Sequence, residues 1–130
     1  MIAHKNYKPP TAAEQRRINM MLALDCICCV MIGYQRDGEK IECHHLLIGN
    51  KRMGHGYTAP CCSGHHRGAW SLQQKLLIPP DVRIAISDGS KLFSRVYGTQ
   101  RELWEKTQRK LGLPVSGWPV SKILPRRHVA

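Results

Sequence analysis

The apolar positions near the start of the chain follow a helical period. Met21 and Leu22 stand three and four positions after Ile18, downstream of the segment Thr11-Ala-Ala-Glu14. In such a capping box, the threonine oxygen and the glutamate carboxylate accept hydrogen bonds from amides that the start of a helix leaves unpaired. The pattern therefore predicts a helix over residues 11–24 whose apolar side faces the core.

Two short apolar runs follow, at residues 30–34 and 40–47, and the Asp37-Gly38 pair between them favours a tight turn. We expect these two runs to pair as a β-hairpin. Residues 49–56 contain glycine and basic side chains and are typical of a loop, after which a short helix is expected to begin near Cys62. The predicted centre of the fold is a β-hairpin followed by a helix.

The second half of the chain is expected to be mostly helical. Residues 72–77 could form a helix that must end before Pro79-Pro80, and residues 82–86 alternate in polarity as a short strand would. A short helix is expected over residues 90–97. The segment Thr99-Gln-Arg-Glu102 is a second capping box, so it predicts a helix that continues to the next glycine in the chain.

Composition limits how the chain can be organised. Its 130 residues, 42% of them hydrophobic, suffice for one compact domain with tails but not for two independent cores. We expect a domain at residues 11–112, a basic N-terminal arm at residues 1–10 and a basic, proline-containing C-terminal tail at residues 113–130. With one Phe, four Tyr and three Trp the core is modest, and small domains often gain stability from a bound metal.

The chain is strongly basic. Twenty Lys and Arg against nine Asp and Glu give a net charge of +11, which makes nucleic acid the first candidate partner, although a merely basic soluble protein would carry the same charge. No apolar run approaches the roughly eighteen residues that span a bilayer, and residues 1–10 lack the hydrophobic core of an export signal. We expect a cytoplasmic protein that does not act at a membrane.

The cysteines are spaced as metal ligands are. Cys26 and Cys29 have the Cys-x2-Cys spacing of a turn that presents two thiolates, and Cys62 and His65 could present two further ligands from the start of a helix. Together these four residues would complete a tetrahedral site. We therefore predict a structural Zn²⁺ ion bound to them.

This spacing leaves other interpretations open. Cys28 could replace a neighbour as a zinc ligand, and Cys61 could replace Cys62. The cysteines could also be buried core residues without a metal, as isolated cysteines often are. Disulfides are the weakest alternative, because the chain has no export signal and its cysteines stand in tight clusters beside histidines.

Two pairs of adjacent histidines indicate a second, catalytic metal. His66 follows the predicted zinc ligand His65 but points about 100° away from it around a helix axis, so it can face a different ion. His44 and His45 stand near the end of a strand, where neighbouring side chains point to opposite faces unless the strand bends or bulges. A divalent ion held by His44 and His66 could bind a scissile phosphate while neutral His45 takes a proton from water. The histidines could instead be extra zinc ligands or surface groups.

These motifs resemble the His-Asn-His (HNH) endonuclease superfamily, and within it the phage recombination-enhancement, RecA-dependent nucleases. The resemblance extends over about residues 26–105 and lies in these segments: Cys26-Ile-Cys-Cys29, Ile41-Glu-Cys-His-His45, Thr58-Ala-Pro-Cys-Cys-Ser-Gly-His-His-Arg-Gly68, Gly89-Ser-Lys-Leu-Phe93 and Tyr97-Gly-Thr-Gln-Arg-Glu-Leu103. It implies an α+β fold with a ββα-metal core, in which a β-hairpin joins a helix over a divalent metal. A zinc knuckle and flanking helices would complete the domain.

The activity that this resemblance implies is metal-dependent DNA cleavage by an endonuclease. It assigns His45 as the general base and His44 and His66 as ligands of a catalytic Mg²⁺ or Mn²⁺ ion. It also implies a role in phage DNA recombination or repair, in concert with a RecA-type filament. If a phage or prophage encodes the chain, the protein would act in the cytoplasm of the bacterial host cell.

The middle polar residue of the superfamily motif would fall near Tyr57, where His55 or Thr58 could substitute for the usual Asn. Trp70 could stack on a base, although a packing role is the better expectation. Several basic side chains are expected at the surface or on a DNA phosphate. They are Lys51, Arg52 and Arg67 near the site, and Arg16 and Arg17 on the first helix.

The competing hypothesis is a noncatalytic, zinc-dependent nucleic-acid-binding module in which the additional histidines are structural. It explains the charge and the zinc ligands, but it gives His44, His45 and His66 no role. Geometry would separate the two hypotheses, because in a nuclease His45 and His66 should converge on a shared open site.

Overall fold

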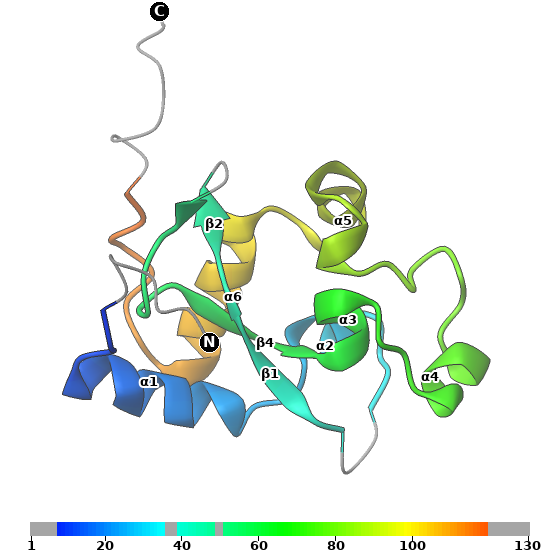
Figure 1. The fold of residues 1–130 in the computed structure, drawn as a ribbon, viewed down its shortest axis with the longest axis horizontal. Coiled ribbons are helices and arrows are strands. Elements are labelled where there is room, and N and C mark those ends of the chain that lie inside the picture. Colours follow the sequence, from blue (N-terminus) through cyan, green and yellow to red (C-terminus); the bar gives the residue numbers. More distant parts are fainter. Residues whose placement is uncertain (1–7, 36–38, 49–50, 120–130) are drawn as a thin grey trace, which may run out of the picture.

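The computed structural model describes residues 8–35, 39–48 and 51–119 (Figure 1). Within these ranges the strands form two small two-stranded sheets, and helices surround them. The chain thus has the predicted α+β class. The elements run in the order α1 (Ala12–Leu22), α2 (Ile27–Met31), β1 (Ile41–His45), β2 (Leu47–Ile48), β3 (Lys51–Arg52), β4 (Thr58–Cys62), α3 (Ser63–Arg67), α4 (Leu72–Leu77), the 3-10 helix η1 (Ile86–Asp88), α5 (Ser90–Tyr97) and α6 (Gln100–Leu111).

Both predicted capping boxes begin helices. In front of α1, Glu14 N–H donates to Thr11 Oγ1 at 3.1 Å, and Thr11 N–H donates to Glu14 Oε1 at 2.8 Å. Thr99 and Glu102 form the same pair of bonds before α6, and Gly112 caps the end of this helix in the left-handed conformation. The predictions for these helices are confirmed, and α1 ends two residues earlier than expected.

The central strand pair differs from the predicted hairpin. Residues 30–34 form no strand, and their first two residues belong to α2. Strand β1 pairs instead with β4 in an antiparallel ladder, with Ile41 opposite Cys62 and His45 opposite Thr58. The physical reason is that a short apolar run fits a buried helix as well as a strand, and β4, which is buried along its whole length, offers β1 a better partner. The predicted turn at Asp37-Gly38 lies outside the described residues.

Part of the connection between β1 and β4 forms two short strands. Strands β2 and β3 pair with each other, although residues 49–56 were expected to form a loop. Leu46 is fully buried beside them; its N–H donates to the Tyr57 carbonyl at 2.9 Å, and its carbonyl accepts from Met53 N–H at 3.1 Å. The chain therefore returns to the end of β1 before β4 begins.

Helices α4 and α5 lie where the sequence predicts them, but the predicted strand at residues 82–86 is wrong. Residues 82–85 form a turn and irregular structure, and the 3-10 helix η1 begins at Ile86. The side chain of Asp88 accepts a hydrogen bond from Ala85 N–H at 2.8 Å. Such a side-chain bond competes with strand pairing and favours a tight turn.

Arg17 is buried, with 8% of its surface exposed, so the expectation that it points to solvent or to a phosphate is wrong. Its Nε donates to Gln108 Oε1 at 2.8 Å, and its Nη1 donates to Thr58 Oγ1 at 2.7 Å. Its Nη2 donates to the Thr58 carbonyl at 3.1 Å. These bonds replace water for the guanidinium and tie α1 and α6 to β4.

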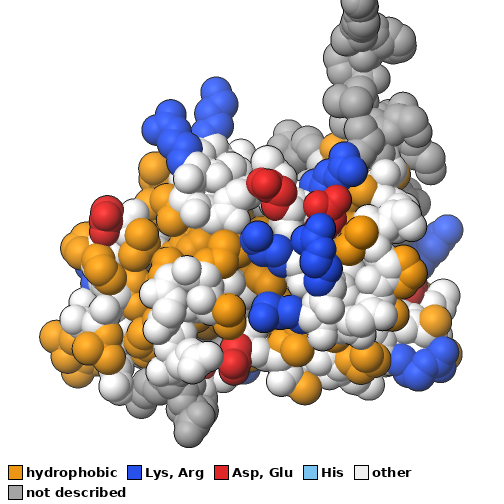
Figure 2. All heavy atoms as spheres, turned by 180° about the vertical axis from the view of Figure 1, so that it is seen from behind, with side chains coloured by type: hydrophobic (Ala, Val, Ile, Leu, Met, Phe, Trp, Pro, Cys, Tyr) orange, Lys and Arg blue, Asp and Glu red, His pale blue; other side chains and the backbone are white. Residues whose placement is uncertain are grey.

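The back of the molecule, turned by 180° from the view of Figure 1, exposes apolar side chains. Figure 2 shows hydrophobic side chains over much of this face, and no group of histidines is visible on it. Helix α4 contributes exposed apolar surface, because Leu72 and Leu76 are 73% and 75% exposed. Among the described residues, no helix has the length and apolar character needed to cross a membrane.

Candidate metal centre and active site

The four predicted zinc ligands meet in the core. Cys26 caps the start of α2, Cys29 lies within it, Cys62 ends β4, and His65 lies in α3. All four residues are buried, and their ligand atoms lie within 4.8 Å of one another. The Nδ1 atom of His65 is 3.6, 3.5 and 3.4 Å from the sulfurs of Cys26, Cys29 and Cys62. The sulfurs of Cys29 and Cys62 are 3.9 Å apart.

These distances fit a zinc ion. With Zn–S bonds of about 2.3 Å and a Zn–N bond of about 2.0–2.1 Å, a tetrahedral site places sulfur and nitrogen about 3.5 Å apart and two sulfurs about 3.8 Å apart. The cluster could therefore hold zinc. Cys28 and Cys61 are fully buried but lie outside the cluster, which favours the predicted set of ligands. None of the six cysteines, all within the described ranges, forms a disulfide.

Hydrogen bonds to sulfur hold the ligands in place. The backbone N–H of Cys29 donates to Cys26 Sγ, and that of His65 donates to Cys62 Sγ, each at 3.4 Å. Gln74 Nε2 also donates to Cys62 Sγ at 3.2 Å, so α4 is attached directly to the metal centre. Such donors stabilise thiolates, which are the metal-binding form of cysteine.

The second nitrogen of His65 is held as well. His65 Nε2 lies 2.7 Å from Tyr97 Oη, and the tyrosine hydroxyl donates to the carbonyl of Val82. Since a carbonyl only accepts, the tyrosine oxygen is left to accept from His65 Nε2–H, and Nδ1 faces the sulfurs. Burial alone would lower the pKa of His65, but hydrogen bonds with Cys26 and Cys62 outweigh it and raise this pKa to about 9. Zinc binding must therefore displace a proton.

Gly64 in α3 leaves room for the ring of Trp70 beside the cysteine–histidine cluster. A Cβ atom on Gly64 would lie 2.2 Å from Cε3 of Trp70. The Trp70 ring packs edge-on against His65, with ring centroids 4.9 Å apart, and it is partly buried against the core. The packing role predicted for Trp70 is confirmed, and it explains why glycine precedes His65.

His44 faces His66 at the junction of β1 and α3. Their ring centroids are 5.2 Å apart. His44 Nε2 lies 3.2 Å from Gln100 Oε1, which also accepts the N–H of Leu47 at 3.2 Å. Because this amide fixes Oε1 as an acceptor, His44 donates from Nε2 and its Nδ1 keeps a lone pair. Burial lowers the pKa of His44 to about 4, so its ring is neutral near pH 7.

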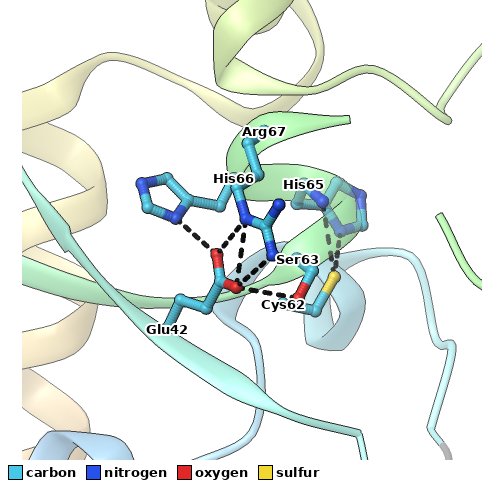
Figure 3. A network of polar contacts seen from close by, with 6 residues as sticks. All are labelled: Glu42, Cys62, Ser63, His65, His66 and Arg67. Carbon is cyan, nitrogen blue, oxygen red and sulfur yellow. Dashed lines mark hydrogen bonds and ion pairs between the residues drawn. The ribbon is translucent and has the colours of Figure 1, made fainter. Parts of the chain in front are cut away.

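Glu42, which the sequence analysis missed, orients His66 (Figure 3). Its carboxylate accepts hydrogen bonds from His66 Nδ1 at 2.8 Å, from Ser63 Oγ at 2.9 Å and from the Arg67 guanidinium at 3.0–3.2 Å. The bonds from Arg67 are the main cause that lowers the pKa of Glu42 to about 2. With Nδ1–H directed at a carboxylate, a neutral His66 keeps its Nε2 lone pair for a ligand.

A signal for Glu42 was present in the sequence. It stands two positions before His44, and residues two apart on a strand share a face. The β1–β4 ladder shows that the strand is regular over this stretch, so Glu42 and His44 lie on the same side of β1. A carboxylate at that position can accept a hydrogen bond from His66 in α3.

His45 lies on the opposite face of β1 from His44, because the ladder contains no bulge of the kind we expected. His45 Nε2 is 3.1 Å from His55 Nδ1. Burial is the main cause that lowers the pKa of His45; the charge of Arg52 lowers it further, as His55 and His66 do when they are protonated. Arg52 and a protonated His66 also lower the pKa of His44. Among the described residues, the contacts thus bring His44 together with His66 but His45 together with His55, so they do not show the shared site of His45 and His66 that a nuclease predicts.

The other predicted supporting residues have different contacts. Thr58 is opposite His45 in the ladder, but its hydroxyl accepts a hydrogen bond from Arg17. The Tyr57 hydroxyl donates to the Gly117 carbonyl at 2.8 Å. Of the three predicted candidates, His55 is the residue that bonds to the ring of His45.

The basic residues near the site differ in their freedom to meet a phosphate. Lys51 and Arg52 are exposed on β3. Arg67 is also exposed, but its Nε and Nη2 both contact the Glu42 carboxylate. Part of its hydrogen-bonding capacity is therefore already used.

The fold and the site define a small, basic α+β protein with a cluster of three cysteines and one histidine that could hold a metal ion, next to a second group of histidines. A family model described as recombination enhancement, RecA-dependent nuclease, matches residues 10–112. The match covers more than half of the chain and includes the cluster and both histidine pairs. The chain belongs to this family.

Proposed function

We propose that the chain is an HNH-type endonuclease that hydrolyses phosphodiester bonds in DNA, with the strand pair β1–β4 and helix α3 as its ββα-metal core. The observation that supports this most is the pairing of His44 with His66. Both rings are held by polar partners that leave one nitrogen lone pair available, and the third histidine, His45, is adjacent in the chain.

The donor set suits a divalent cation beside the zinc centre. His44 Nδ1 and His66 Nε2 would hold Mg²⁺ or Mn²⁺, and Glu42 would keep His66 in the required orientation. When bound, such an ion supplies a Lewis acid for the oxygens of a scissile phosphate. The Zn²⁺ ion at Cys26, Cys29, Cys62 and His65 would be structural, because its four protein ligands leave no open position.

His45 is the general base in this proposal. Its neutral ring takes a proton from a water molecule, the water oxygen forms a bond to phosphorus, and the bond from phosphorus to the departing sugar oxygen breaks. The departing oxygen then takes a proton from solvent. Burial lowers the pKa of His45 below its ordinary value, which favours the neutral ring that a base requires.

DNA would be held mainly by charge. We propose Lys51 and Arg52 as phosphate contacts, and Arg67 as a weaker one because Glu42 already engages it. The basic arm at residues 1–10 and the tail at residues 113–130 would add nonspecific phosphate contacts around the domain at residues 11–112. The family description supports a role in recombination together with a RecA-type filament, in a bacterial host cell if the gene belongs to a phage or prophage.

The proposal is tested by incubating labelled single- and double-stranded DNA with the wild type and with His45→Ala, in Mg²⁺ or Mn²⁺, with and without a RecA filament. We expect the wild type to cleave and His45→Ala to lose at least about 100-fold in rate, the scale of a general base. Zinc content is measured in the same samples to show that the variant is folded. DNA binding without cleavage under every condition would support the noncatalytic module instead.

A further inference from the structure

Two linked hydrogen bonds connect His45 to the N-terminal part of the chain. His45 Nε2 lies 3.1 Å from His55 Nδ1, and the two rings meet edge to face with centroids 5.2 Å apart. On its other side, His55 Nε2 lies 2.7 Å from the backbone carbonyl of Lys8. The three groups form a line that starts at the proposed base and ends at a main-chain oxygen.

The chemistry of the last group determines where the protons are. A carbonyl oxygen only accepts, so His55 must carry its proton on Nε2. In a neutral His55 ring, Nδ1 is then an acceptor, and the proton between the two rings must belong to His45 Nε2. His45 is left with its lone pair on Nδ1.

We propose that His55 is a positioning residue that fixes the tautomer and the ring orientation of His45. This inference rests on the proposed role of His45 as the base. When His45 takes a proton at Nδ1, both of its nitrogens carry hydrogen, and the Nε2–H bond to His55 persists and strengthens because its donor is now charged. The Lys8 carbonyl keeps the His55 ring from turning over. In serine proteases a carboxylate orients the catalytic histidine in a comparable way.

The local structure explains why His55 can reach this position. It lies between β3 and β4, in a segment closed by a hydrogen bond from Tyr57 N–H to the Gly54 carbonyl at 3.1 Å. The bond from Leu46 N–H to the Tyr57 carbonyl then brings this segment back to the residue that follows His45. The segment that contains His55 is therefore held on both sides by hydrogen bonds to Leu46, from Met53 N–H and to the Tyr57 carbonyl.

Activity assays separate this role from a purely structural one. We expect His55→Ala to lower kcat by about 10- to 100-fold, a part of the 10²- to 10⁴-fold that a general base contributes. Zinc content, the midpoint of thermal unfolding and the affinity for DNA should stay close to those of the wild type. His55→Asn should recover most of the rate, because its Oδ1 atom can accept from His45 Nε2–H where Nδ1 does now. An unchanged kcat in His55→Ala would overturn the proposal while leaving the nuclease function intact.

A second measurement does not depend on cleavage. Nitrogen NMR of the full, zinc-bound chain reports which nitrogen of each histidine is protonated. We expect His45 to carry hydrogen on Nε2 in the wild type and to become a mixture of tautomers in His55→Ala. A wild-type His45 with hydrogen on Nδ1 would overturn the proposal even if the protein cleaves DNA. If His45 carries hydrogen on Nε2 but the protein never cleaves DNA, the proposed nuclease function is refuted and the role of His55 in orienting His45 stands.

Discussion

Two neighbouring cysteines offer a direct test of the metal centre. Cys28 and Cys29 are adjacent in α2 and both are buried, with 0% and 4% of their surface exposed. The sulfur of Cys29 belongs to the ligand cluster, and that of Cys28 does not. Substituting each with alanine removes the same atom from the core, so the difference between the two variants isolates the contribution of the metal.

The expected magnitudes differ widely. Cys28→Ala removes one buried sulfur and leaves a small cavity, which should cost about 1–2 kcal/mol of unfolding free energy. Cys29→Ala removes a ligand from a site of a type that contributes about 10–16 kcal/mol in small zinc domains. Domains of this size have a total stability of only about 5–15 kcal/mol. Losing even half of the zinc contribution would therefore leave Cys29→Ala largely unfolded.

The assay combines zinc analysis by atomic emission with urea unfolding followed by circular dichroism, at pH 7 in the presence of a reductant. The wild type and Cys28→Ala should contain one zinc per chain and unfold cooperatively. Cys29→Ala should contain no zinc and show no cooperative transition. Equal zinc content and equal midpoints in the two variants would refute the reasoning, and so would loss of zinc from Cys28→Ala.

Three further substitutions test the surroundings of the site. Gly64→Ala should lower the unfolding free energy by about 1–3 kcal/mol in urea, because the new Cβ meets the Trp70 ring. Arg17→Met should cost about 2–4 kcal/mol by the same method, since it leaves buried oxygens of Thr58 and Gln108 without their donor; an unchanged midpoint would contradict this. Glu42→Gln should raise the Mn²⁺ concentration needed for cleavage by about 10- to 100-fold with zinc retained. Because the folded-state pKa of Glu42 is about 2, against an ordinary 4.5, its carboxylate stabilises the fold above pH 4.5 and this contribution fades as the pH falls towards 2. The stability difference between wild type and Glu42→Gln should shrink between urea titrations at pH 6 and pH 4 on samples in which zinc analysis shows one ion per chain at both pH values; a constant difference would argue against it.

Local patterns predicted the helices because their causes are local. The capping boxes at Thr11 and Thr99 satisfy amides three residues away, so short segments contain the whole signal. The cysteine–histidine cluster was predictable for a related reason, since the Cys-x2-Cys and Cys-x2-His spacings bring possible metal ligands together within single turns. The partner of β1 was mispredicted because strand pairing is long-range, and the apolar run at residues 30–34 fits a helix equally well.

The polar contacts that complete the site were harder to predict. Gln100 bonds to His44 across 56 positions in the sequence, and Arg17 reaches Thr58 across 41. No periodicity connects such residues, because only the packing of helices against β4 brings them together. Glu42 was within reach of sequence reasoning, since alternation on a strand places it on the same face as His44.

The central claim is that two adjacent histidines serve different metals. It is tested most directly by measuring zinc content, circular dichroism and DNA cleavage on the same preparations of His65→Ala and His66→Ala. We predict that His65→Ala loses zinc and the folded spectrum, whereas His66→Ala keeps both and loses cleavage. A folded, zinc-containing His66→Ala that cleaves DNA at the wild-type rate would contradict the claim.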